Sequence, residues 1–241
     1  MNYELRLMRF PLFVPAIVLC LLLASSCSEG TSRATAAAVF SINGRVIFGT
    51  AEGDNFQPVT LKSRIHGGDT VRSSHGASIN LALIPAAFAQ LTGDSEITID
   101  ELTITKDGNQ TAGGMRARTA RIRLDRGKVI VLFTPSDNTT SQFAVTTAQL
   151  TIKPDSDCLF SVWTDGKTTR VTCTKGKLNA PADAQTPITI GAGSFQQWPL
   201  MRKVPVAATE NASAQIDITE SLEAEQRLED GADAWQDRGP F

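Results

Sequence analysis

The chain has 241 residues, of which 41% are hydrophobic and 20% are charged, and its formal net charge is -2. That is enough apolar material for one or two domains with a packed core, and the near-neutral charge argues against a nucleic-acid partner. Two histidines, one tyrosine and four cysteines leave few residues from which to build a metal centre or a histidine-based catalytic site. We therefore expect a protein without a cofactor or an enzymatic activity.

The N-terminal residues have the pattern of a secretory signal. Arg6 and Arg9 precede an uncharged run from Phe10 to Leu23, as in the charged and apolar regions of a signal peptide. The run is shorter than the roughly 20 residues that a membrane-spanning helix needs, although a permanent membrane anchor is the alternative. Residues 1–26 are therefore predicted to be a signal peptide.

The end of this signal, Leu22 to Cys27 (LLASSC), resembles the lipobox of bacterial lipoproteins, with Ala24 where that class usually has leucine. The resemblance implies acylation of Cys27, and Ser28 then favours sorting to the outer membrane. Without acylation, Cys27 would be an odd exposed thiol after export, although an ordinary cleavage site is the alternative. We expect a lipid-anchored protein on the periplasmic side of the bacterial cell envelope. Residues 27–38, which lack large apolar side chains, are predicted to be its lipidated, flexible tether.

The body, residues 39–206, is dominated by short β-branched runs with two-residue alternation. Glycine, aspartate, asparagine and proline separate these runs at spacings of about 8 to 15 residues, which favours an all-β domain over βαβ units. Five of the runs are Ala77–Leu83, Glu96–Ile99, Lys128–Phe133, Gln142–Val145 and Gln149–Ile152.

The densest cluster of charge in the body is a set that we call the basic stripe: Arg116, Arg118, Arg121, Arg123, Arg126 and Lys128. Strand alternation places Arg121 and Arg123 on the face opposite Ile122 and Leu124. The simplest interpretation is a solvated strand face. The alternative is a binding stripe for anionic lipid, a polysaccharide or the protein's own acidic tail. The polar segment 106–115 before the stripe is predicted to be a loop that could admit a partner.

One hairpin is predicted in detail. Asp165-Gly166 is a dipeptide preferred in two-residue type I′ turns, and it separates Cys158–Thr164 from Lys167–Cys173. Pairing outward from that turn places Cys158 directly opposite Cys173, at a separation that a disulfide tolerates. We therefore expect a disulfide between them. Two reduced cysteines in the core are the alternative.

The order of strands and glycines gives a family resemblance. The segments that carry it are Ala38–Val46, Leu61–Val71, Ala77–Leu83, Leu124–Val129, Gln142–Thr147, Val171–Leu178 and Ile190–Gly193. Together, residues 38 to about 198 resemble a FecR-type domain, a periplasmic module found in many envelope proteins. The resemblance implies an all-β fold of stacked short strands, solenoid-like or sandwich-like, without known catalytic residues.

The chain departs from the regulators of that family in one respect. Those regulators have a cytoplasmic segment that binds a sigma factor, followed by a membrane span, whereas only nine residues precede the hydrophobic run here. A transmembrane anti-sigma role is therefore not expected.

The C-terminal tail, residues 207–241, differs in charge from the body. It has nine acidic residues and two arginines, which give a formal charge of -7, whereas Cys27 to Val206 carry 19 basic and 15 acidic residues, or +4. Asp217 to Glu220 resemble a capping box that opens a helix at Ser221, and Gly231 is expected to weaken or end that helix. Docking of the tail on the body, extension to a partner and mobility all stay open.

The remaining candidates for chemistry are weak. His66 and His75 flank a glycine turn nine residues apart and match no metal signature. The leading functional hypothesis is a non-catalytic envelope lipoprotein whose FecR-like β-domain binds an envelope protein or an anionic polysaccharide. The alternative is a periplasmic sensor or regulatory module that passes a signal to a membrane partner. A polysaccharide-active enzyme is the third hypothesis.

Overall fold

The computed structural model describes residues 31–50, 52–53, 55–106, 115–135, 139–154, 156–181, 187–200 and 202–237. The predicted signal peptide and Cys27 lie outside these residues, as does nearly all of the predicted loop at 106–115. Within the described ranges, none of the helical residues forms a segment with the length and hydropathy of a membrane span.

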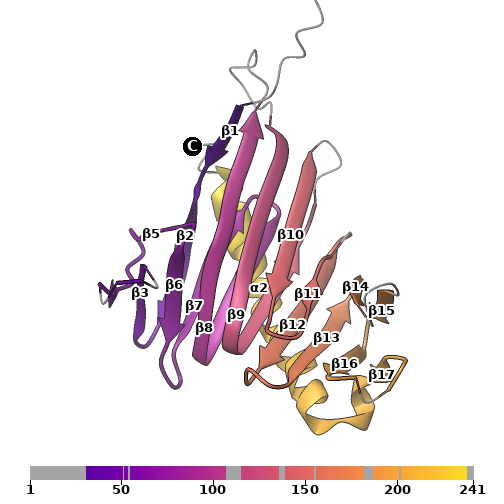
Figure 1. Cartoon of the computed structure of the whole chain (residues 1–241). Coiled ribbons are helices and arrows are strands. Elements are labelled where there is room, and N and C mark those ends of the chain that lie inside the picture. The colour runs from indigo at the N-terminus through magenta and orange to yellow at the C-terminus, as the bar shows by residue number, and fades with distance from the viewer. Residues whose placement is uncertain are drawn as a thin grey trace, which may run out of the picture.

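The described chain is mostly β-strand with one C-terminal α-helix, which confirms the predicted fold class (Figure 1). The strands of the first half are β1 (Thr31–Ala34), β2 (Ala36–Asn43), β3 (Val46–Thr50), β4 (Gln57–Pro58), β5 (Arg64–His66), β6 (Asp69–Ser73), β7 (Ser78–Ile84) and β8 (Ala87–Lys106). The second half contains β9 (Met115–Phe133), β10 (Thr140–Thr146), β11 (Thr151–Ile152), β12 (Cys158–Thr164), β13 (Thr169–Lys175), β14 (Lys177–Pro181), β15 (Pro187–Gly191), β16 (Ser194–Trp198) and β17 (Val206–Ala207). A short 3-10 helix, η1 (Ala208–Glu210), precedes the long helix α2 (Ala212–Asp237).

The long strands β8 and β9 belong to two layers at once. Residues 87–92 of β8 pair with β7 and with residues 128–133 of β9, which also pair with β12. Residues 96–106 of β8 pair instead with β6, β1 and the first part of β9, which also pairs with β10. The sheet therefore folds over at Gly93–Ser95 and Gly127. We call the layer of β2, β7, β12, β13, β16 and β17 the helix-side layer, and that of β3, β4, β6, β10 and β11 the opposite layer.

Gly127 is required at this fold because its backbone has a positive φ of 86° and lies against Ser95. A Cβ on Gly127 would come within 2.5 Å of the Cα atom of Ser95. The side chain of Ser95 is fully buried and accepts a hydrogen bond from the backbone N–H of Lys128 at 2.8 Å. A glycine here is thus needed both for the backbone conformation and for the close approach of two chains.

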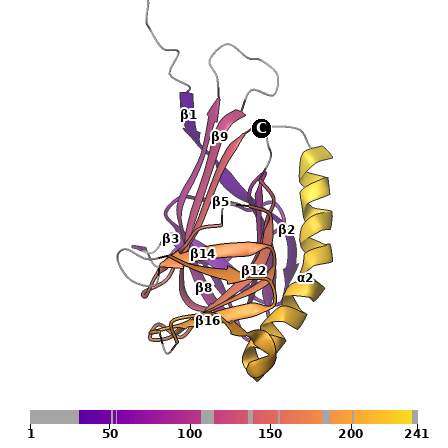
Figure 2. The same cartoon turned by 90° about the vertical axis from the view of Figure 1, so that its right-hand side faces the viewer.

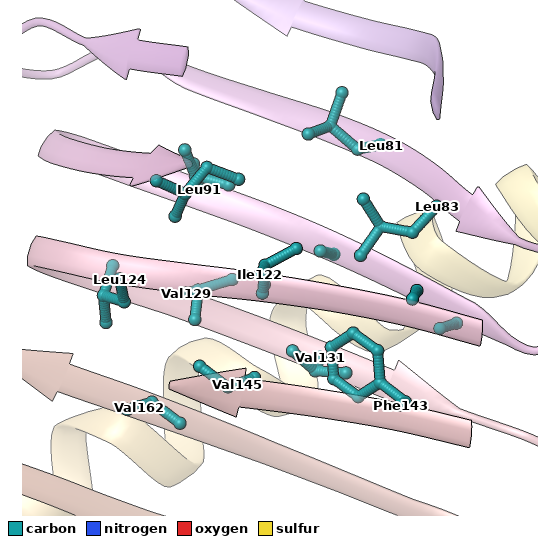
Figure 3. Close-up of a cluster of buried hydrophobic side chains, with 14 of the residues drawn as sticks. Leu81, Leu83, Leu91, Ile122, Leu124, Val129, Val131, Phe143, Val145 and Val162 are labelled. Carbon is teal, nitrogen blue, oxygen red and sulfur yellow. The ribbon is translucent and has the colours of Figure 1, made fainter. Parts of the chain in front are cut away.

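The main core lies between the two layers (Figure 3). Leu81, Leu91 and Val129 come from the helix-side layer, and Ile122 and Val145 come from the opposite layer. The predicted runs supply Leu81, Val129 and Val145, and the predicted alternation next to Arg121 supplies Ile122. Leu91 lies in β8, outside those five runs. Both layers contribute one apolar face each. Of the two implied arrangements, the structure has the sandwich-like one.

Helix α2 covers the outer face of the helix-side layer (Figures 1 and 2). Asn211 caps it, because its Oδ1 accepts a hydrogen bond from the backbone N–H of Ala214 at 3.0 Å. The predicted start at a capping box is therefore wrong, and the helix begins at Ala212, about two and a half turns before Ser221. The helix also continues past Gly231, which the prediction placed at its weakened end. This glycine is buried against the ring of Phe40 in β2, and a Cβ there would clash with the ring.

Two predicted features of the chain differ from the structure. Residues 31–38 are strand rather than flexible tether, because β1 pairs with the end of β8 and the start of β2 pairs with β5. The predicted disulfide is also wrong: no bond joins Cys158 to Cys173.

The disulfide prediction fails because of the hairpin register. The turn has four residues rather than two, since Oδ1 of Asp165 accepts hydrogen bonds from the backbone N–H groups of Lys167 and Thr168 at 2.9 and 2.7 Å. This shifts the pairing by two residues, so Cys173 lies opposite Phe160. On the other side of β12, Cys158 lies opposite Phe133 of β9. Both cysteines are thiols in the core, and burial raises the pKa of Cys173 to about 11.

Candidate interaction surfaces

All six residues of the basic stripe lie on β9, but the structure does not bring them into one surface. Three of them, Arg121, Arg123 and Arg126, are exposed on the opposite layer, and each pairs with an acidic side chain of the neighbouring strand β8. Arg121 pairs with Glu101 at 3.1 Å, Arg123 with Asp100 at 3.3 Å, and Arg126 with Glu96 at 3.3 Å. These cations form a surface ladder of exposed ion pairs, which corresponds to the simplest interpretation of the sequence.

Lys128 is the last residue of the basic stripe. It follows Gly127, where β9 passes from the opposite layer to the helix-side layer, and it faces helix α2. Its Nζ is 2.7 Å from Oδ1 of Asp217 and 2.5 Å from Oε2 of Glu220. Nε of Arg170, on β13, donates a hydrogen bond to Oδ2 of Asp217 at 2.6 Å, and the hydroxyl of Thr172 donates to the same oxygen at 3.1 Å. The acidic tail therefore docks on the basic body through a specific cluster.

This cluster, which we call the Asp217 cluster, is almost inaccessible to solvent. The side chain of Asp217 is 1% exposed, and those of Lys128 and Arg170 are 14% and 12% exposed. Burial alone would raise the pKa of Asp217, but the hydrogen bonds and charges of Arg170 and Lys128 outweigh it and hold the pKa below its usual value. Asp217 is thus ionised at neutral pH. Removal of the carboxylate or of its cationic partners would leave a buried charge without its counter-charge.

Polar and apolar contacts extend the docking of α2 along its length. Nζ of Lys175 lies 2.7 Å from Oε1 of Glu225 near the middle of the helix. The apolar contacts involve Ala224 and Leu228 of the helix and Phe88, Ile130, Leu132 and Leu159 of the sheet. Leu222, by contrast, is 46% exposed.

The described residues that α2 buries were missed because most of them are small or polar. They are Ala214, Asp217, Ser221, Ala224, Leu228 and Gly231. Their spacing of three and four residues is that of one helical face. The same spacing, applied to small residues rather than to leucines, is the sequence signal that could have identified the buried face of α2.

The outer face of the opposite layer carries a groove of about 650 Å³ over β9, β10 and β11. Ala144 and Thr146 of β10 line it together with Gln142, and Arg121 and Lys153 supply positive charge. Arg121 pairs with Glu101 but its side chain is 57% exposed, whereas Lys153 is exposed and has no ion pair with any described residue. The groove is therefore an exposed surface with positive charge at its edge.

The two histidines do not form a site together. Nδ1 of His75 is 2.9 Å from Oδ2 of Asp94, and Nδ1 of His66 is 3.9 Å from Oδ2 of Asp69. Among the described residues, no three His, Cys, Asp or Glu side chains are arranged to hold a metal ion.

Arg116 and Arg118, at the start of β9, lie far along the strand from Lys128 and are separate from the Asp217 cluster.

The middle of the chain matches a known family. A model of the FecR protein family matches residues 69–179, from β6 into β14, which confirms the predicted FecR-type resemblance for these residues. The groove residues 119–154 lie wholly within that match. No curated protein matches the sequence.

Two solved structures similar to this chain are crystal structures, at 1.65 and 2.50 Å resolution, of a "putative anti-sigma factor" from Parabacteroides distasonis ATCC 8503. Each has a TM-score of 0.38 and 13% sequence identity to this chain. The matched region covers 53% of this chain and 53% of that protein, so this chain spans about half of its length.

Proposed function

We propose that this protein is a non-catalytic regulatory module of the bacterial cell envelope, anchored by a lipid on Cys27, whose FecR-type β-domain binds an acidic segment of a partner protein. The observation that carries the proposal is the groove over β9, β10 and β11, within the residues that match the FecR family. Arg121 and Lys153 give the groove a positive edge that complements an acidic ligand.

The position of α2 supports this choice of face. The helix covers the outer face of the helix-side layer and neutralises the cations there, Lys128, Arg170 and Lys175. The groove lies on the other outer face, where Arg121 is 57% exposed. An incoming acidic partner therefore meets accessible positive charge at the groove and not beneath the helix.

Cross-linking in native membranes, followed by mass spectrometry, tests the proposal. The intact protein should carry an acyl modification on Cys27 and should cross-link to a protein through peptides of β10 and β11. Double charge reversal at the groove, Arg121→Glu with Lys153→Glu, should abolish this cross-link at low salt. The control variant Lys167→Glu with Lys203→Glu changes the net charge equally at exposed positions outside the groove.

The results separate the proposal from its competitors. An unchanged cross-link in the groove variant would contradict binding at this face, and recovery of a polysaccharide instead of a protein would favour the glycan-binding function. An unmodified Cys27 would refute the lipid anchor. A sensor for a small ligand would show a ligand-dependent melting temperature without a stable partner.

A further inference from the structure

Strand β10 has one edge that is paired only at its last residues. On one side, β10 pairs with β9 along its whole length, from Thr140 to Thr146. On the other side, β11 pairs only with Val145 and Thr146, beside the arrowhead end of β10 (Figure 1). None of the described strands pairs with residues 140–144 on that side. The opposite layer therefore ends in a strand edge over these residues.

The hydrogen-bond pattern fixes which backbone groups point to this edge. The backbone N–H of Thr147 donates to the carbonyl oxygen of Leu150 at 2.8 Å, across the turn between β10 and β11. Because backbone groups alternate in direction along a strand, those of Val145, Phe143 and Ser141 point to the same side as those of Thr147. On that side, the backbone of Ser141 and Phe143 has no hydrogen bond to a described residue.

The residues after β11 explain why this strand does not continue along the edge. The register of the pair places Pro154 opposite Phe143, and proline has no backbone N–H to donate. The chain also turns toward β14, because the backbone N–H of Lys153 donates to the carbonyl oxygen of Asn179 at 3.5 Å. The protein's own chain thus leaves the edge at Lys153.

The groove occupies the space beside this edge. It has a volume of about 650 Å³, and Ser141, Phe143 and Pro154 are among its lining residues. The lining includes residues from both faces of β10, because Phe143 belongs to the core whereas the exposed Gln142 lies on the outer face. A groove that reaches both faces of an edge strand can accept a further strand in the plane of the sheet.

The two cations of the groove lie in one row with Ala144. Arg121 on β9 is the direct register partner of Ala144, and the β11 register places Lys153 on its other side. Arg121 keeps its ion pair with Glu101 and is 57% exposed. Ala144 has no side chain beyond Cβ that would separate Arg121 from an added strand. An acidic side chain at this row of an added strand would therefore lie next to positive charge on both sides.

We propose that the acidic segment of the partner binds as an additional β-strand on the edge of β10, through main-chain hydrogen bonds to Ser141 and Phe143. This inference rests on the proposed function, from which it takes the acidic partner. Main-chain pairing supplies affinity, and the cations at the row of Ala144 select acidic side chains and fix the register of the added strand.

Hydrogen exchange at single-residue resolution, on the acylated protein in detergent micelles, tests the pairing. The probe is a short synthetic peptide of alternating glutamate and valine. Saturating peptide should slow exchange of the Ser141 and Phe143 amides by at least about tenfold, the effect of one hydrogen bond. The amides of Gln142 and Ala144, which point to β9, should not change. A peptide with lysine in place of glutamate should bind more weakly.

The variant Ser141→Pro, with Ser141→Ala as its control, separates backbone pairing from side-chain contacts. Proline removes the N–H that points to the edge, spares the hydrogen bonds to β9, and is tolerated in edge strands. The hydroxyl of Ser141 has no hydrogen bond to any described residue, so alanine removes no such contact. In native membranes, Ser141→Pro should reduce the partner cross-link by at least about tenfold, and Ser141→Ala should retain it. Thermal melting of both variants verifies folding.

Unchanged exchange of the Ser141 and Phe143 amides with the peptide, or a full cross-link in a folded Ser141→Pro variant, would overturn the inference. Protection of these amides that rises with protein concentration in the absence of peptide would assign the edge to a second copy of the chain instead. A cross-link that survives Ser141→Pro but not the charge reversal at Arg121 and Lys153 would refute strand addition and leave the proposed function standing. The reverse result would refute the acidic partner and support strand pairing at this edge.

Discussion

The two parts of β9 on either side of Gly127 place similar side chains in different surroundings. Arg121 and Arg123, on the opposite layer, are 57% and 44% exposed and pair with carboxylates from the adjacent strand. Lys128, five residues after Arg123, is 14% exposed and meets carboxylates from a helix more than 80 residues away in sequence. The difference shows that the fold at Gly127, rather than the strand pattern, decides which cations stabilise tertiary structure.

Removal of the buried carboxylate should have the largest effect. Asp217→Ala leaves Arg170 and Lys128 without their shared counter-charge, although Glu220 still pairs with Lys128. We expect a loss of about 3 kcal/mol in the free energy of unfolding, measured by urea denaturation. The control Asp125→Ala removes an exposed carboxylate from Arg123, which keeps Asp100, and should cost less than about 1 kcal/mol. Equal losses in the two variants would contradict the distinction between the surfaces.

Acid should release the helix before the sheet unfolds. Because the pKa of Asp217 in the folded state is depressed, its contribution to stability is present above the ordinary pKa and is lost as the pH falls through the folded-state value. The protection factors of the α2 amides, which correct for the slower intrinsic exchange at low pH, should therefore fall progressively below about pH 5. Asp217→Asn should remove this component of the pH dependence, and an unchanged profile in that variant would assign it to other carboxylates.

Gly231→Ala should also loosen the helix. In an isolated helix, alanine is favoured over glycine by about 1 kcal/mol. Here the new Cβ would lie 2.3 Å from a ring atom of Phe40, so we expect a net loss of roughly 1 to 3 kcal/mol from overpacking. Thermal or urea unfolding measures it, with Glu229→Ala at an exposed position of α2 as the control. A more stable Gly231→Ala variant would show that Phe40 moves aside easily.

Neutralisation of one member of the exposed ladder should have the smallest effect. Arg121→Gln removes an ion pair to Glu101 that solvent and salt already screen. We expect a change of no more than about 1 kcal/mol in the free energy of unfolding, and a smaller change in high salt. A loss as large as that of Asp217→Ala would mean that the ladder stabilises the sheet after all.

The prediction of the hairpin shows how far local pattern extends. The pattern of Cys158–Thr164 and its partner strand correctly identified both strands, and Phe160, Val162 and Val171 share the core face. The register was wrong because Asp165 uses its side chain to cap two backbone N–H groups of a longer turn. A shift of two residues keeps every side chain on its predicted face, so the hydrophobic pattern cannot detect it.

The sequence by itself determined the strand content, the apolar faces, the FecR-type resemblance and the charge contrast between body and tail. These are properties of short windows or of total charge, which alternation and composition record directly. Only the tertiary structure decided that β8 and β9 fold across two layers, that Asp217 is buried between Lys128 and Arg170, and that α2 docks through small residues. Those outcomes depend on contacts between segments distant in the chain, where the partner of a charge is chosen by packing and not by sequence spacing.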